Sequence, residues 1–327
     1  MRRSSRRFAT VTTISLLIAL LGSAAGSPVA VGVTDRHVDE PLTRTFRHLD
    51  RDTKWELTER IALDSPTHHP QGFALVGGRI FMSTVEIIKA PVPYDEPRDG
   101  YDRTPGKGRG HLFVLDRDGQ LLKDIVISDG NRYHPGGLDY DGEFLWLPVA
   151  EYRPNSSADI YRIDPTTYDV TKLFTVSDHI GGVVRDQETG HLVGQSWGSR
   201  RFYDWTVGGR QKRFWLNENH FLDYQDCEYV ASRKALCSGV TGLPAQPGAA
   251  TGYELGGLVM IDLRDRHRLL HEVPLQQWST AGHVITRNPT DLDANGSHLT
   301  LYAAPDDSGE AAGTQILVYE ADVTPLS

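Results

Sequence analysis

Three histidines head similar stretches of this sequence and are the residues best suited to chemistry. His69 begins HPQGFALVGGRIF, His134 begins HPGGLDYDGEFLW and His179 begins HIGGVVRDQETGHLV. Imidazole binds zinc, copper, iron or nickel, and three imidazoles with an open position form a catalytic metal site. The sequence therefore predicts a divalent metal ion held by these histidines, with Asp226 as a further ligand. Two other interpretations stay open: a polar or catalytic role without metal, and hydrogen bonds that fix the register of neighbouring repeats.

Two glutamates follow the first two of these hairpins at equivalent positions. Glu86 and Glu151 could supply the acid and base of a reaction, and Glu228 could act as a further acid. The alternative is that Glu86 and Glu151 pair with arginines such as Arg98 or Arg153, which is a common role for carboxylates near a protein surface. Asp226 and Glu228 stand two residues apart and therefore lie on one side of a strand.

The histidine stretches belong to a longer repeat that predicts the fold. Aligned on their apolar residues, the repeats start at five positions separated by 65, 45, 45 and 64 residues: His69, His134, His179, Tyr224 and Asn288. Each repeat has room for four short strands, a pattern typical of propeller blades. We predict an all-β, five-bladed β-propeller with four-stranded blades, in which the unpaired run from Trp55 to Leu63 completes the last blade.

Insertions explain the two long intervals and locate a candidate site. Residues 86–110 and 241–256 are rich in Pro and Gly, and both follow the second strand of a repeat. Because consecutive strands are antiparallel, first strands begin where second strands end, at one mouth of the central channel. Mobile loops and polar side chains at such a mouth indicate a ligand site. The candidate substrate-binding residues there are Tyr152, Trp197, Tyr224 and Asn288.

The N-terminal residues indicate export. Four arginines precede the apolar run Val11–Leu21 and the small residues that follow it, so residues 1–25 are predicted to be a secretory signal peptide, with an arm at 26–53 and one propeller domain at 54–327. Removing four arginines and no acids changes the formal net charge from −9 to −13. An acidic chain without a basic cluster is not expected to bind nucleic acid or, after cleavage of the signal peptide, membranes. We expect a secreted monomer.

Cys227 and Cys237 are the only cysteines and flank one predicted hairpin. In an oxidising compartment they are expected to form a disulfide, and the alternative is a pair of buried thiols.

Two of the repeats resemble a known enzyme family. HPQGF, with Gln71, and DCEYV, with Glu228, are similar to strand motifs of the plant and bacterial glutaminyl cyclotransferases. The resemblance implies a five-bladed propeller with its site at one channel mouth and with Gln71 and Glu228 as site residues. The aligned histidines depart from the pattern of that family. The whole chain is more similar to secreted bacterial and fungal propellers without an assigned activity.

These observations predict an extracellular hydrolase or lyase that acts on a small polar molecule or a carbohydrate at the channel mouth. In this hypothesis the metal is held by the histidines, and Glu86 or Glu151 is the base. A metal-free cyclotransferase-like enzyme and a binding protein without catalytic activity remain the alternatives.

Overall fold

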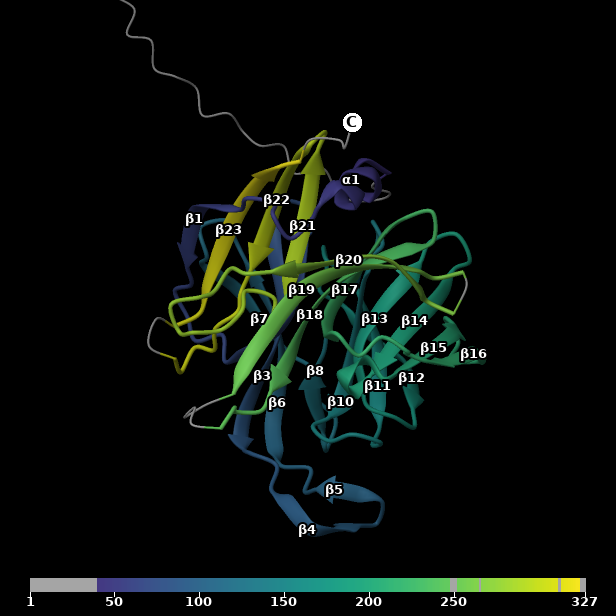
Figure 1. Ribbon diagram of the computed structural model, residues 1–327. Coiled ribbons are helices and arrows are strands. Elements are labelled where there is room, and N and C mark those ends of the chain that lie inside the picture. Colours follow the sequence, from purple (N-terminus) through teal and green to yellow (C-terminus); the bar gives the residue numbers. More distant parts are fainter. Residues whose placement is uncertain (1–39, 248–251, 265, 311–312, 324–327) are drawn as a thin grey trace, which may run out of the picture. The chain divides into compact units, whose positions relative to one another are not determined.

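The computed structural model describes residues 40–247, 252–264, 266–310 and 313–323. Their regular structure is almost entirely β, in five four-stranded blades and one small hairpin (Figure 1). The first strands of neighbouring blades contact one another around the centre, as expected for a β-propeller. The fold class predicted from the sequence is confirmed. The predicted signal peptide lies outside the described residues.

The blades follow one another along the chain, each beginning with its innermost strand. Blade 1 consists of β2 His69–Val76, β3 Arg79–Lys89, β6 Lys107–Leu115 and β7 Leu121–Val126. Blade 2 consists of β8 Arg132–Pro135 with β9 Asp139–Tyr140, then β10 Leu145–Glu151, β11 Ala158–Ile163 and β12 Val170–Val176. Blade 3 consists of β13 Ile180–Asp186, β14 His191–Ser196, β15 Arg201–Thr206 and β16 Gln211–Leu216. Blade 4 consists of β17 Asp223–Ala231, β18 Lys234–Leu243, β19 Tyr253–Asp262 and β20 Arg268–Leu275. Blade 5 consists of β21 Thr290–Asn295, β22 His298–Ala303, β23 Gln315–Asp322 and β1 Glu56–Ala62.

Blade 5 is closed by the N-terminal strand β1, as predicted. Its residues pair antiparallel with β23, Ile61 opposite Ile316 and Ala62 opposite Gln315. Ile61 and Ile316 are buried with side chains of blade 1. The pairing covers the edge that β23 would otherwise expose, so β1 removes a site for unwanted strand addition.

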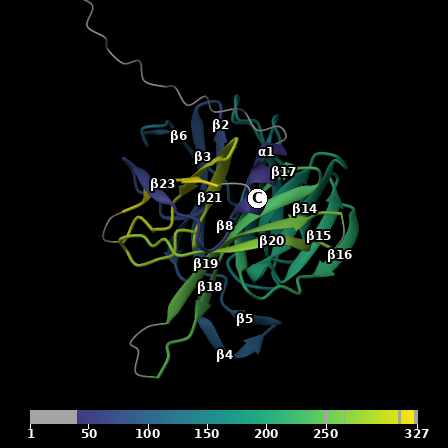
Figure 2. The same cartoon turned by 45° about the horizontal axis from the view of Figure 1, so that its top comes forward.

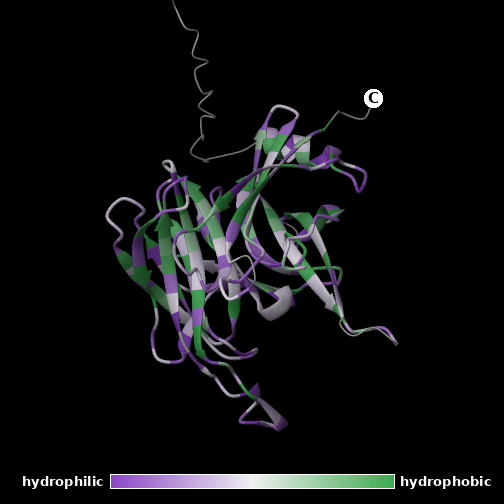
Figure 3. Cartoon of the chain, turned by 90° about the vertical axis from the view of Figure 1, so that its left-hand side faces the viewer, coloured by the Kyte–Doolittle hydropathy of each residue, from purple (hydrophilic) through white to green (hydrophobic). Residues whose placement is uncertain are grey.

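The core consists of layers between neighbouring blades. Leu112 and Val114 of blade 1 pack against Leu147 and Val149 of blade 2, and all four are fully buried. Figure 3 shows the resulting alternation of hydrophobic and hydrophilic residues along the strands. The outermost strand of each blade is more exposed, because it pairs with another strand only along its inner edge. Burial thus increases toward the channel, where the polar residues of interest begin.

The repeated glycines allow the innermost strands to approach one another closely. A Cβ atom on Gly136 would lie 2.3 Å from the carbonyl oxygen of Gly181, and one on Gly72 would lie 2.7 Å from the backbone nitrogen of Leu138. Gly137 donates a backbone hydrogen bond of 2.8 Å to Gly181. Any larger residue at these positions would push neighbouring blades apart, which explains the glycines of the repeat.

Both insertions project from one side of the blades (Figures 1 and 2). The first contains the hairpin of β4 Pro93–Arg98 and β5 Tyr101–Arg103. The second extends β18 and β19 beyond the neighbouring strands, as far as Leu243 and Tyr253. Their predicted place, between the second and third strands of a blade, is confirmed.

Part of the expected N-terminal arm is helical. Helix α1 Glu40–Thr45 and the short 3-10 helix η1 Phe46–His48 precede β1. Leu42, Phe46 and Leu49 are fully buried against blades 4 and 5, and the Thr45 hydroxyl donates a hydrogen bond of 2.7 Å to the Gly296 carbonyl. The sequence did not predict this helix, because three apolar residues in a short polar segment are too few to show a helical period.

The predicted disulfide is present. Cys227 on β17 and Cys237 on β18 are directly opposite each other and form a disulfide, which links two strands of blade 4. In the described part of the chain, none of the helices is both long and apolar enough to cross a membrane.

Candidate functional site

His134 and His179 lie side by side at the mouth where first strands begin. Their ring centroids are 5.7 Å apart, and both side chains are almost completely buried. Burial lowers the pKa of His134 well below its ordinary value, and the nearby His179 and His69 lower it further. Burial also lowers the pKa of His179 to about 4, although its Nδ1 contacts the Glu151 carbonyl at 2.7 Å. Both imidazoles are therefore neutral at pH 7.

Two aromatic residues complete a group of four rings, which we call the ring cluster: His134, His179, Tyr152 and Trp197. Tyr152 lies 4.2 Å from His134 and 5.8 Å from Trp197, while Trp197 meets His179 edge-on at 4.8 Å, all between centroids. Tyr152 and Trp197 were predicted to stand near the histidines, and the structure places them there. Burial raises the pKa of Tyr152, so its hydroxyl stays protonated at neutral pH.

His69 forms a dyad with Asp307 beside the ring cluster. Its Nδ1 lies 2.6 Å from Oδ1 of Asp307, and both side chains are partly exposed, at 21% and 29%. Burial alone would raise the pKa of Asp307, but the hydrogen bond with His69 and the charge of Arg287 bring it below the ordinary value. An ionised Asp307 holds the proton of His69 on Nδ1, which leaves Nε2 as a proton acceptor.

Asn288 and Arg287 position the dyad from blade 5. The amide of Asn288 donates to Asp307 at 3.3 Å and to the Pro305 carbonyl at 2.9 Å, and Arg287 approaches the other oxygen of Asp307 at 3.7 Å. Asn288 was a candidate for substrate binding, and its observed contact is with Asp307. Arg287 was missed, because an arginine just before an Asn-Pro turn gives no signal of its own.

The two candidate bases Glu151 and Glu86 are paired with arginines. Glu151 is buried and contacts Arg153 at 2.6 Å and the Ser157 hydroxyl at 2.9 Å. Glu86 contacts Arg109 at 3.0 Å. The structure thus shows the arginine pairing that was the alternative to an acid–base role. The partner of Glu86 is Arg109 and not Arg98.

Tyr224 does not occupy the level of the histidines. The register of blade 4 shifts between Tyr224 and Asp226, as that of blade 1 does between Pro70 and Gly72. Asp223 is therefore the equivalent of His69, and the sequence alignment was wrong by one residue at this point. Because successive residues of a strand face opposite sides, this shift turns the Tyr224 side chain toward the space between blades 3 and 4.

Asp226, Glu228 and Gln71 were the remaining candidates for site residues. Asp226 is buried in the channel and accepts a hydrogen bond of 2.9 Å from the backbone nitrogen of Phe73. Glu228 lines a channel cavity of about 20 Å³ together with Asp139 and Asp291. Gln71 donates to the carbonyl of its neighbour Pro70 at 3.0 Å. These contacts give no support to the cyclotransferase-like site.

The first insertion reaches the ring cluster. The guanidinium of Arg103 on β5 lies 5.1 Å from the ring centroid of Trp197, and that of Arg153 lies 3.5 Å from the ring of Tyr101. Arg103 also lowers the pKa of Tyr152 while burial raises it, so the two groups are within electrostatic reach. The β4–β5 hairpin therefore brings Arg103 to the mouth as an ion pair with Asp102, at 2.7 Å. The sequence patterns did not single out Arg103.

The predicted metal site is not recognisable in the arrangement of donors. Among the described residues, no three His, Cys, Asp or Glu side chains are grouped so that they could hold a metal ion. His69 directs Nδ1 to Asp307, and His179 directs Nδ1 to a backbone carbonyl.

Comparisons with known proteins identify a family. A model of DUF6454, described as a family of unknown function, matches residues 33–325. No curated protein matches the sequence.

Three solved structures illustrate the likeness. Luciferin-regenerating enzyme has a TM-score of 0.45 and 11% identity, over 83% of this chain and 95% of that chain. The major Malassezia sympodialis allergen Mala s 1 has a TM-score of 0.40 and 12% identity, over 80% and 82%. Virginiamycin B lyase from Staphylococcus aureus has a TM-score of 0.40 and 9% identity, over 81% and 99%. At these values the likeness carries nothing about the activity of this chain.

Proposed function

We propose that the channel mouth is the active site of an acid–base enzyme, a hydrolase or a lyase, which acts on a small polar or carbohydrate substrate. The chain belongs to DUF6454, a family of unknown function. The observation that carries the proposal is the His69–Asp307 contact of 2.6 Å beside two neutral, buried histidines. A histidine oriented by a carboxylate is a general base at neutral pH.

Each group near the dyad has a role in this proposal. In hydrolysis, Nε2 of His69 accepts a proton from the water that attacks the substrate, and the imidazolium returns this proton to the leaving oxygen as its bond breaks. In elimination, Nε2 takes the proton from a carbon next to a carbonyl, a double bond forms to the neighbouring carbon, and the oxygen that leaves this carbon takes up the proton. The protonated hydroxyl of Tyr152 donates a hydrogen bond to the oxygen on which negative charge develops. Arg103 stabilises the same charge, because its guanidinium lies within electrostatic reach of Tyr152. Trp197 provides a flat apolar wall for the substrate.

We further propose that the enzyme is exported. The support is the signal-like composition of residues 1–25 together with the Cys227–Cys237 disulfide, a bond that persists in oxidising compartments. Recovery of the mature chain from the culture medium, with an N-terminus near residue 26, is the expected result. Retention of residues 1–25 in the cell-associated protein would contradict export by cleavage.

The activity can be tested with three probes, 4-nitrophenyl acetate, 4-nitrophenyl glycosides and polygalacturonate. We expect turnover of at least one of them, and a loss of roughly 100-fold or more in kcat for His69→Gln and Asp307→Asn. His298→Gln is the matched control, because His298 contacts Asp322 at 3.0 Å in a similar but exposed pair. The control should keep full activity.

Two results would count against the assignment. Turnover that survives His69→Gln would remove the dyad from the mechanism, and no turnover of any probe would favour a binding protein. Activity that disappears with EDTA and returns with Zn²⁺ would replace proton transfer by His69 with the metal-dependent mechanism that the three histidines first suggested.

A further inference from the structure

The β4–β5 hairpin depends on side-chain contacts for its position beside the ring cluster. Among the described strands, β4 and β5 pair only with each other (Figure 1). A two-stranded hairpin by itself is marginally stable in water. Contacts with the blades must therefore hold it in place.

The root of the hairpin, at residues 105–108, is fixed by Tyr133 of blade 2. Tyr133 is fully buried, and its hydroxyl donates a hydrogen bond of 2.6 Å to the Pro105 carbonyl. A Cβ atom on Gly106 would lie 2.6 Å from that hydroxyl, and one on Gly108 would lie 2.4 Å from the Tyr133 ring. The two glycines thus let Tyr133 pack tightly against the root. The strands beyond the root need a support of their own.

Arg153, in the loop after β10, supplies that support. Its guanidinium lies 3.5 Å from the ring centroid of Tyr101 on β5, within the range of a cation–π contact. Glu151 holds the same guanidinium with contacts of 2.6 and 2.8 Å, and the Ser157 hydroxyl donates a hydrogen bond of 2.9 Å to Glu151. Only 11% of each charged side chain is exposed, and a cation–π contact is stronger where water is excluded.

The backbone around Arg153 is also held in place. The Arg153 amide donates a hydrogen bond of 2.8 Å to the Glu151 carbonyl, and the Glu151 amide donates one of 2.9 Å to the Ser157 carbonyl. The Ser156 hydroxyl donates a hydrogen bond of 2.7 Å to the Arg153 carbonyl. This closed turn presents the arginine to the hairpin in one position.

Tyr152 connects the same turn to the ring cluster. It lies between Glu151 and Arg153 in the sequence, and its ring packs on His134 at 4.2 Å between centroids. The Glu151 carbonyl lies 2.7 Å from Nδ1 of His179. Three consecutive residues therefore contact the histidines on one side and the hairpin on the other.

The position of the hairpin decides where Arg103 lies. Asp102 binds the Arg103 guanidinium through contacts of 2.7 and 2.9 Å, so this guanidinium is fixed to the hairpin. Tyr101 and Arg103 are two residues apart on β5 and so share one face, and both are half-buried while Asp102 is exposed. A hairpin that is held at Tyr101 therefore holds Arg103 at Trp197 as well, where the guanidinium lies 5.1 Å from the ring.

We propose that Arg153 is a positioning residue of the site at the mouth. Held by Glu151, it fixes the β4–β5 hairpin through Tyr101. The hairpin in turn places Arg103 beside the ring cluster. This role accounts for the buried Glu151, which the proposed mechanism does not use. The inference rests on the proposed function for the effect on catalysis, whereas the position of the hairpin can be measured without any turnover.

The test is hydrogen exchange of the purified protein, followed by mass spectrometry at the backbone amides of residues 92–104. Tyr101→Leu removes a ring that lies outside the blades, so the propeller should fold as before. The amides of the hairpin should then exchange roughly 3-fold faster or more, as expected for the loss of a cation–π contact. Arg153→Leu should give a similar acceleration. The double variant should exchange no faster than either, because both changes remove the same contact.

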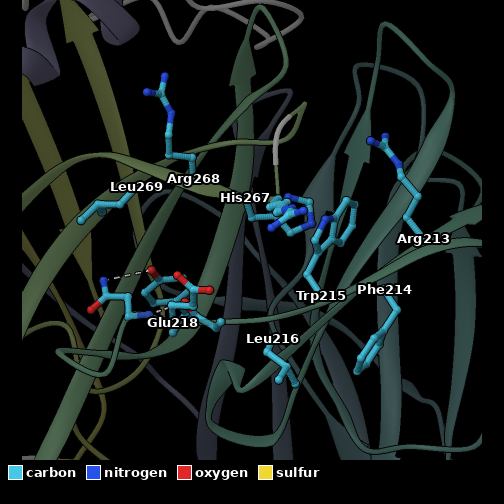
Figure 4. A pocket seen from close by; sticks show the side chains of 12 residues that line it. Arg213, Phe214, Trp215, Leu216, Glu218, His267, Arg268 and Leu269 are labelled. Carbon is cyan, nitrogen blue, oxygen red and sulfur yellow. Dashed lines mark hydrogen bonds between the residues drawn. The ribbon is translucent and has the colours of Figure 1, made fainter.

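Two variants are matched controls for the exchange experiment. Tyr101→Phe keeps the aromatic ring and should exchange like the wild type. Arg213→Leu removes another arginine that is paired with a carboxylate, Asp204 at 2.9 Å, and lies 5.1 Å from an aromatic ring, that of Trp215. This pair lies at the outer edge of blade 3 (Figure 4), so exchange in the hairpin should stay as it is in the wild type.

Kinetics test whether Arg153 acts through Arg103. With a probe that the wild type turns over, Arg153→Leu and Arg103→Leu should each lower kcat by roughly 10-fold and change KM little, because Arg103 acts on charge that develops during the reaction. The double variant should be no slower than either single variant.

Two results would overturn the proposal: unchanged exchange of the hairpin in Tyr101→Leu, or losses of kcat that multiply in the double variant of Arg153 and Arg103. If no probe is turned over, the proposed function fails, whereas faster exchange in Tyr101→Leu and Arg153→Leu would still support the role of Arg153 in holding the hairpin.

Discussion

Replacing Asp139 by asparagine should make the stability of the propeller less dependent on pH. Asp139 is buried in the channel, and its two carboxylate oxygens accept hydrogen bonds from the backbone nitrogens of Arg185, at 2.7 Å, and Tyr229, at 3.1 Å. One side chain of blade 2 thus holds blades 3 and 4. Burial raises its pKa from 3.8 to about 7, more than these two hydrogen bonds lower it.

The sign and size of the effect follow from this pKa. Between pH 4 and 7 the folded protein keeps a proton that the unfolded chain has released, so the free energy of unfolding falls as pH rises. The slope is about 1.4 kcal/mol per pH unit, or roughly 3 kcal/mol from pH 4.5 to 6.5. Asparagine has no such proton, but it can accept only one of the two hydrogen bonds, which costs about 1–3 kcal/mol at every pH.

The measurement is urea unfolding of the wild type and Asp139→Asn at pH 4.5, 5.5, 6.5 and 7.5. The variant should be clearly less stable at pH 4.5, and the difference should shrink by roughly 3 kcal/mol by pH 6.5 and change little above pH 7. Asp164→Asn is the control. Backbone hydrogen bonds from Thr167 and Thr166 lower the pKa of Asp164, so its contribution is lost only as pH falls through the acid range. A difference for Asp139→Asn that stays constant or grows with pH would refute the reasoning.

Two further predictions concern the blades themselves. Replacing Cys227 and Cys237 together by serine should lower the free energy of unfolding by roughly 3 kcal/mol, the chain-entropy value for a loop of this length, in urea titrations; an unchanged midpoint would show that the disulfide constrains little. Gly136→Ala should lower the free energy of unfolding by about 1–3 kcal/mol, and Tm with it, because the new methyl group would lie 2.3 Å from the Gly181 carbonyl oxygen. Gly208→Ala, where the nearest atom is 4.0 Å away, is the control for scanning calorimetry, and equal shifts for both variants would contradict the close packing of the blades.

The fold was largely predictable from the sequence, because the same pattern is repeated along the chain. Period, turn residues and glycines recur in five copies, so an error in one copy did not hide the others. The N-terminal strand could be assigned by counting strands. The alignment was wrong by one residue at Tyr224, although the bulge at Gln225 corresponds to the bulge at Gln71 in blade 1.

The site was predictable only in part. The starts of the strands gave His69, His134 and His179, while Tyr152 and Trp197 followed from the ends of the second strands. The partners of these side chains come from other blades and from the first insertion: Asp307 and Arg287 from blade 5, and Arg103 from β5. Such contacts depend on how the blades are arranged around the ring, and the spacing of residues within one repeat does not predict that arrangement.

The pairing of β1 with β23 also constrains the order of folding. The Thr58 hydroxyl donates to the Val318 carbonyl, a contact across 260 positions of the chain. Blades 1 to 4 each contain their own four strands and can form one after another as the chain is made from its N-terminus. The strand at 56–62 is synthesised before all of them but has no partner until residues 315–322 have emerged. The first strand to be synthesised is thus the last to pair. A chain truncated before residue 315 would have four complete blades but could not close the ring.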